Sequence, residues 1–168
     1  MLKDFPTFID PLRLAQENCV LRGHIAVEQF SRILNSLCNT QGTASFEWLF
    51  TTDEQHPIIK GWIKAPLQMV CQRCLQQMTW DLETQVSLVI LTDEQSNKTT
   101  PPDYETLVIT KIPVSLVALI EDEIILALPI AVTHDKCLTN DYCLPDEVDS
   151  KVKDQQDNPF QVLKMLKN

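Results

Sequence analysis

Two cysteines two residues apart carry the clearest chemical signal in this 168-residue sequence. Cys71 and Cys74 enclose Gln72-Arg73, between two long segments in which apolar and polar residues alternate. Such alternation indicates β-strands, so the pair is predicted at the tip of an antiparallel hairpin. A turn of this kind can aim two thiolates at one point, where they bind one Zn²⁺.

A second group of metal-binding side chains follows further along the chain: His134, Cys137 and Cys143. A tetrahedral zinc site needs four ligands, and the C-x-x-C supplies two of them. We therefore expect a zinc site that uses Cys71, Cys74 and two of these three residues. The alternatives are reduced thiols without a metal, or a thiol oxidoreductase. A redox C-x-x-C uses a helix N-terminus to lower the pKa of its first thiol, and the flanking strands do not supply one.

A third pattern could contact RNA or a partner. Lys60, Trp62 and Lys64 fall on one face of a predicted strand, opposite its apolar face. An aromatic ring between two cations can stack a single-stranded base and hold its phosphates, and Arg73 at the hairpin tip could extend this surface. The alternative is an ordinary solvent-exposed face on which lysine stems shield a tryptophan.

Paired carboxylates, which can do acid–base or metal chemistry, occur at Glu121, Asp122 and Glu123 within an otherwise apolar helix. No His, Ser or Lys is spaced to complete a catalytic set with them, and the sequence has no glycine-rich phosphate loop. We expect these residues to form the exposed stripe of the helix, or to anchor a neighbouring loop. The protein is therefore predicted not to be an enzyme, with an uncharacterised hydrolase as the alternative.

The elements that position these residues predict an α+β fold. Asp10 followed by Pro11 indicates a short N-terminal helix. Period-two alternation predicts an antiparallel, partly rolled sheet of about five strands. Two helices are expected to cover it. The strands are expected within 19–25, 43–51, 58–70, 76–91 and 104–109, and the covering helices at 26–38 and 114–128.

The C-terminal part differs in composition from the rest. Residues 1–140 are predicted to form one domain, and 141–157 a flexible acidic linker with almost no apolar residues. Residues 158–168 are predicted to form a short amphipathic helix. Its Phe160, Leu163 and Leu166 could contact the body of the protein or a partner.

Charge and hydropathy limit the classes of binding partner that we expect. Fourteen Lys and Arg against twenty-three Asp and Glu give a formal net charge of -9, and the basic residues are scattered. A broad phosphate-binding surface needs clustered cations, so extensive non-specific RNA binding is not expected, while a basic protein partner or a small RNA contact is. The sequence shows no signal peptide and no apolar run as long as a membrane span, which predicts a cytoplasmic protein without a membrane contact.

Several of these motifs together resemble one bacterial family. They are the opening Asp10-Pro11-Leu12-Arg13-Leu14-Ala15, the hairpin tip Val70-Cys71-Gln72-Arg73-Cys74, the apolar helix with its acidic triplet and closing Leu128-Pro129, His134-Asp135, and the closing Asn158-Pro159-Phe160-Gln161-Val162-Leu163. In this order they resemble the YceD family of large ribosomal RNA subunit accumulation proteins, whose description also includes metal binding and nucleic-acid binding.

The resemblance implies a role in biogenesis of the large ribosomal subunit and no catalytic activity. It attaches the metal to Cys71 and Cys74 and to the cysteine-bearing segment after the helix, where this chain has uneven spacing. With the acidic charge, it predicts a factor that supports synthesis, processing or accumulation of large-subunit ribosomal RNA through contacts with assembly components or a basic ribosomal protein. The first alternative is a zinc-binding RNA-binding module.

Overall fold

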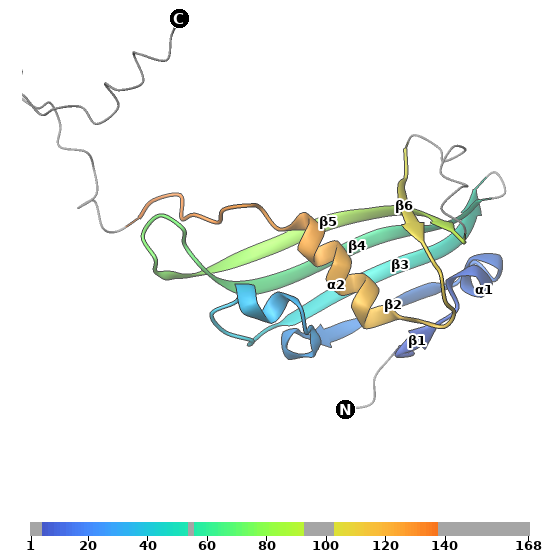
Figure 1. Cartoon of the computed structure of the whole chain (residues 1–168), viewed down its shortest axis with the longest axis horizontal. Coiled ribbons are helices and arrows are strands. Elements are labelled where there is room, and N and C mark those ends of the chain that lie inside the picture. The colour runs from blue at the N-terminus through green and yellow to red at the C-terminus, as the bar shows by residue number, and fades with distance from the viewer. Residues whose placement is uncertain (1–4, 54–55, 93–102, 138–168) are drawn as a thin grey trace, which may run out of the picture. The chain divides into compact units, whose positions relative to one another are not determined.

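Five strands form one open sheet in the computed structural model, which describes residues 5–53, 56–92 and 103–137 (Figure 1). The strands lie in the order β2–β3–β4–β5–β6. Their bounds are β2 Val20–Ala26, β3 Thr43–Asp53, β4 His56–Val70, β5 Gln77–Leu91 and β6 Glu105–Val108. The fold is α+β, as the sequence predicts.

The sheet is mixed rather than purely antiparallel. The β2–β3, β3–β4 and β4–β5 pairs are antiparallel, but β6 runs parallel to β5, with Leu88 opposite Glu105 and Leu91 opposite Val108. A parallel neighbour requires a long connection that returns the chain to the same end, and residues 92–104 are long enough to do so. Alternation shows that a strand exists but not its direction, so this detail was not predictable from the pattern.

The longest hairpin carries the C-x-x-C at its tip, as predicted. β4 and β5 pair continuously from Ile58 opposite Val89 to Val70 opposite Gln77. One side of β4 faces the core: Ile59, Ile63 and Leu67 have no exposed surface. Successive side chains of a strand point to opposite faces, so Lys60, Trp62 and Lys64 lie on the other side, which we call the outer face.

The main core lies between the sheet and helix α2, Leu116–Ala127, which crosses one face of the sheet (Figure 1). Leu116, Ile120 and Ile124 recur at helical spacing and are fully buried. They belong to the same cluster as an edge-to-face aromatic row from β3 and the N-terminal segment, Phe5, Phe46, Trp48 and Phe50. Apolar burial therefore fixes α2 against the sheet, as its sequence indicates.

The smaller elements are close to expectation. Helix α1, Pro11–Gln16, begins after Asp10, whose carboxylate accepts the backbone N–H groups of Leu12 and Arg13. The predicted helix at 114–128 begins two residues later than expected, because β7, Val114–Ser115, pairs with β1, Phe8–Ile9. Ser115 then caps α2 by accepting the Ala118 N–H.

The predicted helix at 26–38 is wrong. Only two 3₁₀ turns form there, η1 at Val27–Gln29 and η2 at Ile33–Ser36. The apolar positions are buried as expected, with Val27, Phe30 and Ile33 at most 1% exposed. The backbone N–H groups of Arg32 and Ile33 donate to the Glu121 carboxylate at 2.6 and 3.1 Å instead of to carbonyls one helical turn earlier. A buried side chain from α2 thus replaces the helical hydrogen bonds.

Two residues of the acidic triplet, Glu121 and Asp122, therefore hold a neighbouring loop, which is one of the two roles expected from the sequence. Glu121 is only 3% exposed, and Arg32 Nε also donates to its Oε2 at 3.2 Å. Arg32 further binds the exposed carboxylate of Asp122 and the Ala118 carbonyl. These contacts tie the 3₁₀ turns to α2.

Glu123, the third residue of the triplet, is half-buried, and its environment makes stability depend on pH. Burial raises its pKa from 4.5 to about 7, and the nearby charges of Glu105 and Asp122 add to the effect. Between these two values the folded state binds more protons than the unfolded state. Stability is therefore expected to fall as pH rises through this window, and the penalty is complete above about pH 7.

Replacing Glu123 with Gln should remove this penalty. The variant should be more stable than the natural protein at pH 8 by about 1–2 kcal/mol, a value reduced for the exposed part of the side chain, and equally stable at pH 4. Urea unfolding at the two pH values measures this. Glu28→Gln, on η1, is the matched control for the loss of one carboxylate. Equal stability of Glu123→Gln and the natural protein at pH 8 would contradict the assignment.

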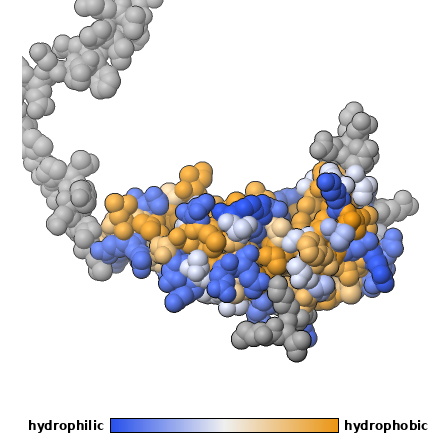
Figure 2. Space-filling view, turned by 60° about the horizontal axis from the view of Figure 1, so that its bottom comes forward, coloured by the Kyte–Doolittle hydropathy of each residue, from blue (hydrophilic) through white to orange (hydrophobic). Residues whose placement is uncertain are grey.

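The predictions for the acidic linker 141–157, for the segment 158–168 with Phe160, Leu163 and Leu166, and for Cys143 lie outside the described residues. In the described part of the chain, no helix is both long and apolar enough to span a bilayer. Figure 2 shows hydrophobic and hydrophilic residues interspersed over the visible face.

Candidate metal centre

The tip of the β4–β5 hairpin is a tight loop that buries one cysteine. The Leu75 N–H donates to the Cys71 carbonyl and the Cys71 N–H to the Gln76 carbonyl, each at 2.9 Å. Leu75 closes the loop with a positive φ of 60°. Cys71 is fully buried, whereas Cys74 is partly exposed.

The segment after α2 runs back to this tip and binds it through backbone atoms. The Gln72 N–H donates to the Val132 carbonyl at 2.8 Å. Arg73 Nη2 donates to the His134 carbonyl at 2.6 Å. The His134 N–H points at the Cys71 sulfur, 3.4 Å away. These contacts bring His134 to the cysteines from about sixty residues away in the sequence.

Four donor side chains consequently converge. One ligand atom from each of Cys71, Cys74, His134 and Cys137 lies within 4.8 Å of every other. The Cys74 sulfur is 3.3 Å from His134 Nδ1. Of the candidate ligands named from the sequence, the four that the structure describes are therefore brought together, and Cys143 lies outside the described residues.

The donor set fits zinc. Three thiolates and one imidazole are a common structural zinc ligand set, and four protein ligands leave no position for a substrate or water. Bond lengths of about 2.0–2.3 Å place tetrahedral ligand atoms roughly 3.3–3.8 Å apart, a separation that small side-chain movements can reach from the observed cluster. The geometry therefore supports a structural site that would hold the segment after α2 against the hairpin.

The surroundings of Cys71 favour its thiolate, the form that binds a metal. Burial raises the pKa of this thiol. The backbone N–H groups of Cys74, His134 and Arg73 that face the sulfur have the larger, opposite effect, and together they lower the pKa from 9.0 to about 5. No helix N-terminus contributes, since β4 and β5 flank the loop. A low pKa is also required of a redox cysteine, but the third thiol and the imidazole beside this one are the pattern of a metal site.

The proposed contact surface is divided by the structure. Lys60, Trp62 and Lys64 share the outer face of β4, with the Lys64 ammonium 5.7 Å from the centre of the Trp62 ring. Arg73 lies at the hairpin tip, beyond Val70, which is about 20 Å along the strand from Lys64. Its guanidinium binds the carbonyls of His134 and Asp135. Arg73 therefore belongs to the cysteine–histidine cluster and not to the Trp62 surface.

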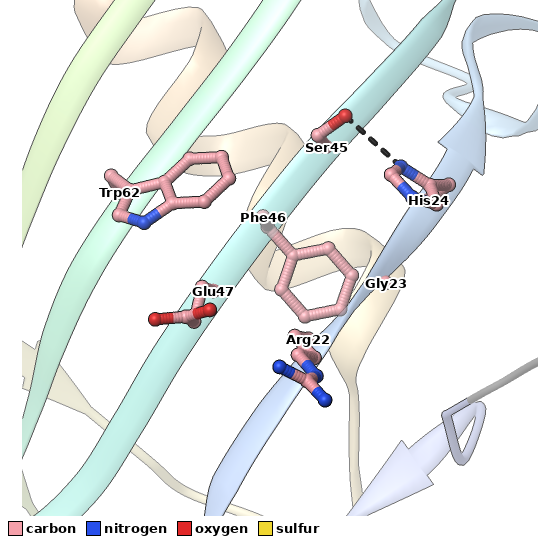
Figure 3. A pocket seen from close by; sticks show the side chains of 7 residues that line it. All are labelled: Arg22, Gly23, His24, Ser45, Phe46, Glu47 and Trp62. Carbon is pink, nitrogen blue, oxygen red and sulfur yellow. Dashed lines mark hydrogen bonds between the residues drawn. The ribbon is translucent and has the colours of Figure 1, made fainter.

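A hollow beside Trp62 was not anticipated from the sequence. Its lining includes Arg22 and His24 of β2 and Ser45 and Glu47 of β3 (Figure 3). The register places Arg22 opposite Glu47 and Glu47 opposite Trp62, in one row across three strands. The hollow could have been predicted only by pairing each predicted strand with the next one along the chain. That step needs the register of β2 against β3, which neither strand's sequence determines alone.

Two comparisons with known proteins found relatives. The sequence model of the family described as "Large ribosomal RNA subunit accumulation protein YceD" matches residues 59–167. A protein of that name from Haemophilus influenzae (strain ATCC 51907 / DSM 11121 / KW20 / Rd) is 27% identical over 175 residues. The alignment covers 96% of this chain and 95% of the relative. No solved structure matches the chain.

Proposed function

Since this chain belongs to the YceD family, we propose that it is a non-enzymatic cytoplasmic factor for biogenesis of the large ribosomal subunit. It supports the synthesis, processing or accumulation of large-subunit ribosomal RNA, mainly by binding assembly components such as a basic ribosomal protein. The family description and the full-length relative of the same name support the link to this RNA.

The observation that carries the non-enzymatic part is the closed set of four donors, Cys71, Cys74, His134 and Cys137. We propose that they hold one Zn²⁺, whose chemistry here is the cross-linking of two chain segments. The metal fixes residues 132–137 against the hairpin tip, where the Gln72 N–H and the Arg73 guanidinium already bind the carbonyls of Val132 and His134. A surface fixed in this way can be recognised by a partner without any turnover.

Charge favours a protein partner for most of the contact. A net charge of -9 repels RNA phosphates but attracts basic proteins, and ribosomal proteins are of that kind. The alternative, a zinc-binding RNA-binding module, is favoured by the exposed cations on either side of Trp62. The two functions differ in whether association depends on RNA.

Affinity capture of the tagged full-length protein from a bacterial lysate, with and without ribonuclease, tests the proposal. Large-subunit assembly components, basic ribosomal proteins among them, should be recovered in both samples, because the contacts are with protein. Capture from a lysate expressing the Cys74→Ser variant should recover less of them. Recovery of RNA alone, lost after ribonuclease, would favour the RNA-binding module, and recovery of no ribosomal component would contradict both.

A further inference from the structure

The hollow beside Trp62 has the chemistry of a nucleobase site. It has a volume of about 460 Å³ and opens on the outer face of the sheet. Gly23 and Phe46 lie at its base; the ring of Phe46 is buried in the core on the other face. Its polar side chains come from β2 and β3 and Trp62 from β4, so the sheet fixes their relative positions (Figure 3).

Its charged groups are opposite in sign and unpaired. Arg22 and Glu47 are cross-strand partners, yet among the described residues neither forms an ion pair or a side-chain hydrogen bond. Figure 3 shows the Glu47 carboxylate between the Trp62 indole and the Arg22 guanidinium. A ligand here meets an acceptor and a donor side by side, next to an aromatic ring.

We propose that this hollow binds one unpaired guanine base of single-stranded RNA. Guanine presents N1–H and N2–H₂ donors on one edge, which a carboxylate accepts, and adjacent O6 and N7 acceptors, which a guanidinium binds. Its ring stacks on Trp62. Adenine has an acceptor nitrogen where guanine has N1–H. Two hydrogen-bond acceptors, adenine N1 and the Glu47 carboxylate, would then face each other without a proton between them.

A basic protein side chain is the competing occupant, and the hollow suits it less well. An arginine could stack on Trp62 and pair with Glu47, but Arg22 would then face it as a like charge. A neutral planar base meets no such repulsion. The His24 ring, held by its Nδ1 contact with Ser45 Oγ at 3.0 Å, borders the other side of the hollow.

Two cations are available for the phosphates that flank the base. Lys60 and Lys64 precede and follow Trp62 on the same face, and the exposed Lys60 ammonium lies 4.9 Å from the centre of the Tyr104 ring. Lys64 pairs with Glu83 at 2.8 Å, but both side chains are more than half exposed, and such pairs exchange readily for another anion. With only one or two phosphates neutralised, affinity should depend weakly on salt, with a log–log slope of about -0.7 to -1.4. This is compatible with the acidic charge of the chain.

This inference rests on the proposed role in ribosomal RNA accumulation and names one RNA contact within it. The test uses the purified, zinc-supplemented full-length protein and four short RNAs, UUGUU, UUAUU, UUCUU and UUUUU, titrated by isothermal calorimetry. UUGUU should bind at least about fivefold more tightly than UUAUU. Glu47→Gln should abolish this preference, because an amide can also pair with adenine. Trp62→Ala should weaken all four RNAs about tenfold or more.

Control variants separate the site from folding. Glu28→Gln removes a carboxylate from η1 and should keep the guanine preference. Thermal unfolding should show that Glu47→Gln, an exchange of nearly equal shape, remains folded. Equal affinity for the four RNAs, or a guanine preference that survives Glu47→Gln, would overturn the proposal. So would binding of a basic peptide that depends on Glu47 while no RNA binds. Because no lysate partner is involved, failure here leaves the capture experiment unaffected, and the two proposals can fail separately.

Discussion

Replacing Cys74 with serine is expected to remove the metal and a large share of the folding free energy. The protein purified without chelator should contain about one zinc per chain, and the variant less than about a tenth of that. A ligand present at about 1,000 times its Kd stabilises a folded protein by about 4 kcal/mol, and the variant should lose an amount of this order. Elemental analysis and urea unfolding, with and without chelator, measure the two effects.

Cysteines elsewhere in the chain provide matched controls. Cys19→Ser removes a thiol that is outside the cluster and should keep both zinc and stability. Cys137→Ser should lose zinc, whereas Cys143→Ser should retain it, because Cys137 is the residue found beside the other donors. Zinc retained in Cys74→Ser, or zinc absent from the natural protein, would contradict a structural metal at this site.

Replacing Glu121 with alanine should destabilise the protein by about 2–4 kcal/mol, because two backbone donors lose their buried acceptor. The half-exposed Arg32 guanidinium contributes little to this cost. Its carboxylate accepts the backbone N–H groups of Arg32 and Ile33 at 2.6 and 3.1 Å and lies 3.2 Å from Arg32 Nε. The variant leaves two backbone donors and a guanidinium without this acceptor. Urea unfolding at pH 7 measures the change.

A comparison with Asp122 shows whether the stability effect of Glu121 comes from its burial or only from its charge. Asp122 also pairs with Arg32 but is 48% exposed, so Asp122→Ala should cost less than about 1 kcal/mol. Glu121→Gln keeps one oxygen acceptor and should fall between the two. If Glu121→Ala and Asp122→Ala are equally mild, the carboxylate of Glu121 does not hold the 3₁₀ turns. Glu121 lies away from the outer face, so RNA binding by the folded fraction should not change.

Local sequence patterns were sufficient to predict those helices and strands whose backbone hydrogen bonds are not replaced by contacts with distant residues. The strands at 43–53, 56–70 and 77–91 follow from alternation because one of their faces is buried, and the hairpin follows from two such runs around a short loop. The start of α1 follows from Asp10 and Pro11. Residues 26–38 have equally good helical spacing, but the backbone donors of Arg32 and Ile33 bind Glu121, almost ninety residues away. A local pattern contains no information about such a partner.

The same distinction applies to the metal site and to the hollow. The sequence alone determined the C-x-x-C at a hairpin tip, three candidate ligands near position 140, and a tryptophan between two lysines, because these depend on spacing within one element. Only the tertiary structure decided that His134 and Cys137 join Cys71 and Cys74, that Arg73 binds the returning segment, and that Glu47 and Arg22 lie beside Trp62. These arrangements are set by strand register and by the path of the chain after α2, which result from burial of the whole core rather than from any one segment.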